Sequence, residues 1–210
     1  MLQHEYLINK GILKTLSIIK AFEKIRREDF LPDEVRSMFP IDAPLQIGYG
    51  QTNSQPSTVA FMLERLEAKT GDKILDVGCG SGWTTALLAE IVGESGKVYG
   101  IEIIPELADI ARANVNKYDY GNQGRTKIFL TDGYQGLPEE APFDKILVSA
   151  AAEKIPEALI KQLNAGGKMI IPLGKEYEAQ DLVIITKAED GEIKEERIPG
   201  FIFVPLVKSL

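Results

Sequence analysis

Three glycines separated by single residues follow an apolar stretch near the centre of the chain. The segment 74–77 (Ile-Leu-Asp-Val) precedes Gly78, Gly80 and Gly82, and a helical pattern follows. A strand that enters such a turn and continues into a helix forms the floor of a nucleotide site. A dinucleotide fingerprint would place a further glycine at Trp83, and a phosphate loop would need Gly-Lys-Ser/Thr, which this chain lacks. The turn is therefore not expected to bind phosphate.

Two acidic residues fall where neighbouring strands of the same sheet would end. The run 97–103 predicts a second strand, with Glu102 near its carboxyl end and about 20 positions beyond Gly82, the usual spacing of a carboxylate that binds a ribose diol. A third predicted strand, 126–131, leads directly to Asp132, which could reach the amino group of a base. Carboxylates for a diol and a base, without phosphate-binding glycines, favour S-adenosylmethionine over NAD as the ligand.

Each of these residues also has a purely structural interpretation. The glycines could serve only a tight strand-to-helix turn, because glycine costs conformational entropy unless special backbone geometry is needed. Asp76 could bond a neighbouring backbone group, and Glu102 and Asp132 could be ordinary surface acids. Cys79 is expected to be a small residue in a crowded turn rather than a nucleophile.

A second polar and glycine-rich segment, 47–56, leads into a helix that is predicted to begin near Pro56. Ser54 could be the N-cap of this helix, with Pro56 in its first turn, an arrangement worth about 1 kcal/mol. A helix start also presents free N–H groups to an anion, so capping does not exclude a functional role for the segment.

The composition limits the classes of function. A chain of 210 residues is long enough for one well-buried core and short for two. The net charge of −7 argues against broad binding of nucleic acid, whose phosphates are bound by Lys and Arg. The single histidine, His4, nearly excludes His-based triads and multi-His metal sites, so no metal is expected. A local basic face remains open for Lys10, Lys14, Lys20, Lys24, Arg26 and Arg27.

The expected location is the cytoplasm. No run approaches the roughly 20 apolar residues needed to span a bilayer, and no charged-then-apolar leader opens the chain. The single cysteine precludes an intramolecular disulfide and fits a reducing compartment. We expect a monomer without membrane contact.

From Lys73 onward the hydrophobic pattern alternates between strands and helices, which indicates a parallel sheet covered on both faces. The predicted strands are 73–78, 97–103, 126–131, 143–149 and 167–172, and the predicted helices are 83–92, 105–118 and 156–163. Two further strand runs, 182–186 and 193–198, flank Asp190-Gly191, a hairpin signal. We predict an α/β fold: a Rossmann-like, doubly wound sheet with a site for S-adenosylmethionine and a C-terminal antiparallel hairpin.

The first forty residues predict a helical lead-in that is broken at Pro32 and Pro40. The residues expected on its one apolar stripe are Leu13, Leu16, Ile18 or Ile19, and Phe22. Residues 41–56 are predicted to be a loop. We expect a single domain over 1–210, in which 1–56 form the helical lead-in and active-site loop and 57–210 form the cofactor-binding core.

The chain resembles the protein-L-isoaspartate O-methyltransferases, repair enzymes that methylate the abnormal carboxylate formed when Asn deamidates or Asp isomerises. The glycine motif is shared by many methyltransferases, whereas the Gln-Thr-x-Ser segment and the Phe-Val-Pro-Leu ending are more particular. The similarity covers nearly the whole chain. The matching segments are 50–56, 75–82, 100–102, 132–133 with Gly136, 141–146, 150–152, 159–163 with 166–167, 171–174 and 203–206.

The resemblance implies S-adenosylmethionine as cofactor and isoaspartyl peptides and proteins as partners. It implies that Ser54 takes part in catalysis, that the segment 52–55 closes over cofactor and substrate, and that Val204 and Pro205 line the peptide site. The implied cofactor contacts are Thr52, Asn53, Gln55, Asp76, Gly78, Cys79, Gly80, Ser81, Gly82, Glu102, Ile103, Asp132 and Gly133. The family commonly has Ile where this chain has Asn53, so the loop could be tuned to another substrate.

The expected reaction requires no strong base. A carboxylate with a reference pKa near 4 is already ionised at pH 7. Ser54 is expected to orient it by donating a hydrogen bond to the oxygen that does not attack. A related methyltransferase that acts on a small-molecule carboxylate or on RNA, and a non-catalytic cofactor-binding module, remain open alternatives.

Overall fold

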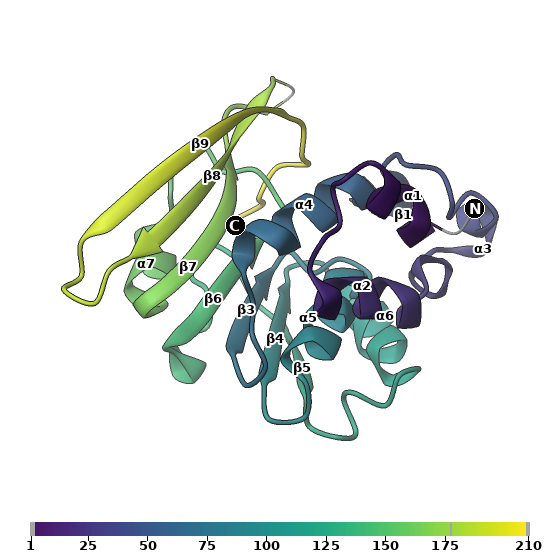
Figure 1. Cartoon of the computed structure of the whole chain (residues 1–210), viewed down its shortest axis with the longest axis horizontal. Coiled ribbons are helices and arrows are strands. Elements are labelled where there is room, and N and C mark those ends of the chain that lie inside the picture. The colour runs from purple at the N-terminus through teal and green to yellow at the C-terminus, as the bar shows by residue number, and fades with distance from the viewer. Residues whose placement is uncertain (1–2, 177, 209–210) are drawn as a thin grey trace.

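The centre of the protein is a seven-stranded sheet with the order β5-β4-β3-β6-β7-β8-β9. The computed structural model describes residues 3–176 and 178–208 (Figure 1). The strands are β3 (Lys73–Val77), β4 (Lys97–Glu102), β5 (Thr126–Leu130), β6 (Phe143–Val148), β7 (Leu163–Leu173), β8 (Gln180–Lys187) and β9 (Ile193–Phe201). Neighbouring strands from β5 to β7 are parallel, whereas β7, β8 and β9 pair antiparallel. The predicted fold class, including the C-terminal hairpin, is confirmed.

The helices fall close to the predicted ranges. They are α1 (Gln3–Asn9), α2 (Leu16–Lys24), η1 (Arg27–Phe30), α3 (Asp33–Arg36), α4 (Pro56–Leu66), α5 (Trp83–Val92), α6 (Pro105–Asn116), η2 (Pro138–Glu140) and α7 (Glu157–Gln162). Helix α5 has the predicted bounds. Helix α6 ends two residues early, because the chain turns at Asp119 with a φ of 63°. Strand β7 begins four residues before its predicted start, directly after α7.

Strand β3 contributes to two separate cores, because its alternate side chains point to opposite faces of the sheet. Ile74 packs in a cluster with Trp83 of α5. Leu75 and Val77 pack on the other face with Leu159 of α7. All three β3 side chains are fully buried, as expected for a parallel strand with helices on both sides.

The predicted stripe of the N-terminal helical lead-in is partly wrong. The chain breaks between α1 and α2, where the Glu64 carboxylate accepts hydrogen bonds from the backbone N–H groups of Lys14 and Thr15 and from the Thr15 hydroxyl. Because α2 begins only after this anchor, Leu16 points to solvent with 64% of its surface exposed. The buried residues of α2 are Ile18, Ala21 and Phe22, and Leu13 is buried ahead of the helix.

The prediction of a loop over residues 41–56 is also wrong in part. The segment forms a short antiparallel hairpin of β1 (Leu45–Gly48) and β2 (Gln51–Asn53). Gly48 and Gly50 have φ values of 91° and 72°, which glycine adopts without strain, and they flank the exposed Tyr49 at the tip. The glycines and polar residues that suggested a loop therefore belong to the turn and to the strand facing the candidate site.

Candidate active site

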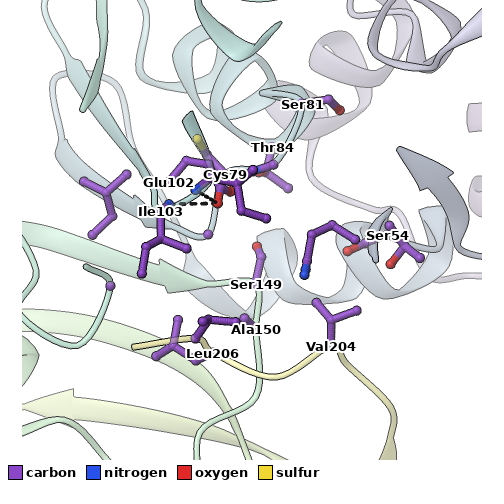
Figure 2. A pocket seen from close by; sticks show the side chains of 18 of the residues that line it. Ser54, Cys79, Ser81, Thr84, Glu102, Ile103, Ser149, Ala150, Val204 and Leu206 are labelled. Carbon is purple, nitrogen blue, oxygen red and sulfur yellow. Dashed lines mark hydrogen bonds between the residues drawn. The ribbon is translucent and has the colours of Figure 1, made fainter. Parts of the chain in front are cut away.

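One pocket lies at the carboxyl ends of the central parallel strands, where ligands bind in doubly wound sheets. Figure 2 shows Ser54 and Val204 at one end of this pocket, Glu102 and Ile103 at the other, and Ser149 and Ala150 between them. Its lining is Gln51, Thr52, Asn53, Ser54, Gly78, Cys79, Gly80, Ser81, Trp83, Thr84, Ile101, Glu102, Ile103, Ile104, Thr131, Gly133, Ser149, Ala150, Val204, Pro205, Leu206 and Val207. Within the part of the chain that the structure describes, Glu102 is the one charged side chain in this lining.

The glycine turn is held against strand β4 and against helix α6. The backbone N–H groups of Gly78 and Cys79 donate to the Ile101 carbonyl at 2.9 and 3.1 Å. Gly82 does not line the pocket; a Cβ atom there would lie 3.2 Å from the Ala111 backbone, and its φ is 90°. Gly82 thus lets α6 pack closely, while Gly78 and Gly80 form the floor. Burial raises the pKa of the Cys79 thiol well above its usual value, so this thiol is not a nucleophile at neutral pH.

Glu102 is held rigidly at the edge of the pocket. Its Oε1 accepts hydrogen bonds from the backbone N–H groups of Ile103 (2.8 Å) and Ile104 (3.0 Å), and its Oε2 accepts one from Gly80 (2.9 Å). A carboxylate has about four acceptor positions. Three are filled by the protein, and the remaining one is available to a sugar hydroxyl in the pocket.

Asp76 lies beneath the pocket and does not line it. Its Oδ2 accepts hydrogen bonds from the hydroxyls of Thr84 (2.7 Å) and Thr85 (2.6 Å) in the first turn of α5. Complete burial raises the pKa of Asp76 to about 6, the two hydroxyls oppose this, and the charge of Glu102 adds to it. Asp76 therefore anchors the helix that follows the glycine turn.

The acid predicted to bind a base is placed beside the pocket rather than in its lining. The Asp132 carboxylate accepts a hydrogen bond from the backbone N–H of Tyr134 at 2.8 Å. Gly133 does line the pocket, and a Cβ atom there would lie 2.9 Å from side-chain atoms of Val77 and Leu206. The C-terminal segment thus packs directly against the end of β5.

Ser54 lines the pocket and does not cap helix α4. The N-cap residue is Gln55, which makes no side-chain capping bond and does not line the pocket. The cap comes from Asp42, whose Oδ1 accepts a hydrogen bond from the backbone N–H of Ser57 at 2.9 Å. The predicted N-cap role of Ser54 is wrong, and its hydroxyl makes no hydrogen bond within the described residues.

One wall of the pocket comes from the C-terminal segment. The Ala151 N–H donates to the Val204 carbonyl at 2.8 Å, and the Leu206 N–H donates to the Ala151 carbonyl at 2.7 Å. The Gln180 side chain accepts a bond from the Phe203 N–H at 2.7 Å and so fixes the approach to this segment. Val204 and Pro205 both line the pocket.

Sequence reasoning missed several lining residues and one buried residue behind them. Ser149 and Ala150 follow directly after β6, so the rule that ligands bind at strand ends could have found them. The sequence places Arg27 in a run of basic residues, but the residue is 2% exposed and bonded to the loop that carries Ser54. Nothing in the local sequence distinguishes it from its basic neighbours.

The fold and the pocket define a methyltransferase that uses S-adenosylmethionine. A family model described as protein-L-isoaspartate(D-aspartate) O-methyltransferase matches residues 3–210, so the chain belongs to this family. Proteins named protein-L-isoaspartate O-methyltransferase from Methanopyrus kandleri and Ignicoccus hospitalis are 44% and 46% identical to it; the alignments cover 97% of this chain and 88% and 94% of those proteins.

A solved structure is similar over the same length. It is described as a protein-L-isoaspartate O-methyltransferase from Plasmodium falciparum in complex with S-adenosyl-L-homocysteine. The TM-score is 0.88 at 29% identity, and the match covers 99% of this chain and 97% of that one. Within the residues described for the present chain, no helix is long and apolar enough to cross a membrane, and no group of three or more His, Cys, Asp or Glu could hold a metal ion.

Proposed function

We propose that this chain transfers a methyl group from S-adenosylmethionine to the free carboxylate of isoaspartyl residues in damaged proteins and peptides. The family match over residues 3–210 carries the proposal. The pocket supports it, because Ser54 and Glu102 lie in the same cavity at opposite ends (Figure 2).

The charges of the pocket suit the cofactor. S-adenosylmethionine supplies a methyl group on a positively charged sulfur. Among the described residues the lining includes the carboxylate of Glu102 and no Lys or Arg, so no lining cation repels the sulfonium. Glu102 would accept a ribose hydroxyl, and the floor of Gly78 and Gly80 leaves room because no side chain projects from it.

The same absence of lining cations suits the nucleophile. A carboxylate is ionised at pH 7, so the protein need not remove a proton from it. A Lys or Arg partner would strengthen the hydrogen bond and lower the nucleophilicity, whereas the neutral Ser54 hydroxyl would orient one oxygen and leave the other free to attack. Alignment of the reacting atoms can contribute about 7 to 11 kcal/mol to catalysis.

Substrate selection is assigned to the end of the pocket beside Val204 and Pro205. An isoaspartyl linkage runs through the side-chain carbonyl and leaves the α-carboxylate free, so the main chain is displaced by one methylene. Fit to a single methylene discriminates only about 10- to 200-fold. A larger preference requires that the carboxylate of a normal Asp fail to reach the methyl group in line.

The test is radiolabelled methyl transfer to a pair of peptides that differ only in Asp and isoAsp. We expect kcat/KM for the isoAsp peptide to exceed that for the Asp peptide by at least a hundredfold. Val204→Asp should raise KM for the peptide without changing cofactor affinity, and Ile202→Asp, at an exposed position outside the pocket lining two residues earlier, is the matched control. Equal rates on the two peptides, or transfer only to a small acid or RNA, would contradict the proposal.

The RNA alternative has no specific observation in its favour. Three of the six cations in the basic N-terminal run are paired or buried: Lys24 with Glu90 at 2.8 Å, Arg26 with Glu28, and Arg27 in the core. We also propose that the protein is a single domain and a monomer. The single cysteine suggests a cytoplasmic location.

A further inference from the structure

Arg27 is a buried cation directly behind the wall of the pocket. It lies at the start of η1, is 2% exposed, and forms no ion pair within the described residues. All three of its side-chain nitrogens instead donate to oxygen atoms of the segment 39–54. Burial lowers the pKa of Arg27 to about 10, with Asp42 opposing the shift, so the side chain stays charged at neutral pH.

The hydrogen bonds of Arg27 join both sides of the β1–β2 hairpin. Before the hairpin, the carbonyl groups of Phe39 (3.2 Å), Ile41 (2.8 Å) and Ala43 (2.8 Å) accept bonds from the guanidinium. At its end, the carbonyl groups of Asn53 (3.3 Å), the last residue of β2, and of Ser54 (3.1 Å) accept bonds from Nη2. Arg27 therefore fixes the backbone of Ser54 at the point where the chain leaves β2.

The guanidinium also contacts the wall formed by helix α5. Its central carbon lies 5.5 Å from the ring centroid of Trp83, a distance that allows a cation–π interaction. Trp83 is the first residue of α5 and lines the pocket. One side chain thus connects the Ser54 loop with the helix that follows the glycine turn.

Asn53 completes the set of acceptors. Its Oδ1 accepts a hydrogen bond from Nε of Arg27 at 2.8 Å, and the residue is 5% exposed. An apolar side chain at position 53 would leave the buried Nε–H without this partner. The contact with Arg27 explains why a polar residue stands at position 53. Asn53 makes this contact through its side-chain carbonyl oxygen.

We propose that Arg27 and Asn53 are positioning residues, which hold Ser54 at the location from which its hydroxyl orients the substrate carboxylate. The proposal rests on the proposed function and goes beyond it, because Arg27 lies outside the pocket lining and the side-chain oxygen of Asn53, which does line the pocket, is bonded to Arg27. A displacement of about 1 Å can reduce a reaction rate roughly 100-fold. Loss of the bond between Arg27 and Asn53 therefore affects turnover more than binding.

The test removes one of the six hydrogen bonds that Arg27 donates. Replacing Arg27 itself would leave all six acceptors without this donor at once. Asn53→Ala should lower kcat on the isoAsp peptide at least tenfold and leave the Kd for S-adenosylhomocysteine, measured by calorimetry, within twofold. Asn53→Asp retains an oxygen acceptor and should keep kcat within threefold of the parent. Asn122→Ala, at an exposed position, is the matched control and should change neither.

Two results of the kinetic and binding measurements would overturn the proposal. One is an unchanged kcat in Asn53→Ala, and the other is a loss of S-adenosylhomocysteine affinity as large as the loss of kcat, which would make Asn53 a cofactor contact.

Hydrogen exchange provides a readout that does not depend on the reaction. The amides of residues 52–54 should exchange faster in Asn53→Ala than in the parent, and equal exchange contradicts the proposal. If the parent protein does not methylate the isoAsp peptide, the proposed function fails, and the exchange result alone decides whether this contact holds the loop.

Discussion

At the scale of single residues, the role of Ser54 depends on which group caps helix α4. A serine that capped the helix would have its hydroxyl committed to a backbone N–H. Asp42 supplies that acceptor from a distant part of the chain, and Gln55 occupies the N-cap position. The Ser54 hydroxyl is therefore available to a ligand in the pocket that it lines.

Ser54→Ala separates catalysis from stability. A hydrogen bond to a charged group contributes about 1.5 to 3 kcal/mol, so kcat should fall roughly 10- to 150-fold. The melting temperature should stay nearly constant, because no capping bond is lost. The matched control is Ser57→Ala in the first turn of the same helix. Turnover at the parent rate, or a large drop in melting temperature, would argue against the orienting role.

The residues predicted from the sequence are those that follow a simple positional rule. Glu102 and the glycine turn lie at the ends of apolar strands, and both line the pocket. Asp76 lies inside β3, one residue before the end of the strand, and its carboxylate faces α5 instead of the pocket. Arg27 obeys no local rule, because its partners lie 12 to 27 positions away in the chain.

At the scale of secondary-structure elements, the start of α4 is stabilised by a residue that precedes the β1–β2 hairpin. Asp42→Ala would leave the Ser57 N–H without its acceptor and should lower the free energy of unfolding by about 1 kcal/mol. Asp42→Asn keeps an oxygen at the same position and should cost much less. Urea unfolding of the three proteins at pH 7 measures both effects. Equal stability of the Ala and Asn variants would exclude this capping role.

Element boundaries could be predicted where the apolar pattern ends abruptly and not where tertiary contacts decide them. Helix α5 begins directly after Gly82 and ends before Gly93, so its range is evident from the sequence. The break before α2 depends on Glu64, a residue of α4 that is about 50 positions away. The β1–β2 hairpin escaped detection because the polar residues of its second strand serve the pocket rather than the core.

At the scale of the whole molecule, the pocket is assembled from six separate segments of the chain. They are 51–54, 78–84, 101–104, 131–133, 149–150 and 204–207. The central parallel strands bring four of these segments to one edge of the sheet, and the end of the β1–β2 hairpin and the C-terminal segment supply the other two. The rigid sheet therefore supplies the floor, and the parts near the proposed substrate come from irregular segments that need anchors such as Gln180.

Asp76, which anchors helix α5 beneath the floor of the pocket, also links the stability of the molecule to pH. Asp76 is fully buried, its Oδ1 has no hydrogen-bond partner within the described residues, and its pKa is raised from 3.8 to about 6. Between these two values the folded protein binds more protons than the unfolded chain. The free energy of unfolding therefore decreases as pH rises through this window. The stabilisation that comes from the proton bound at Asp76 is complete below about pH 4 and is lost above about pH 6.

Asp76→Asn should remove this pH dependence, because an amide does not ionise and its oxygen can still accept from Thr84 and Thr85. Relative to the parent, the variant should gain on the order of 3 kcal/mol of stability between pH 4 and pH 7. Urea unfolding at several pH values measures this difference, with Asp33→Asn, which removes an exposed carboxylate paired with Arg36, as the surface control. A constant stability difference across the window would mean that Asp76 keeps an ordinary pKa, and that the buried carboxylate is stabilised by its threonine partners alone.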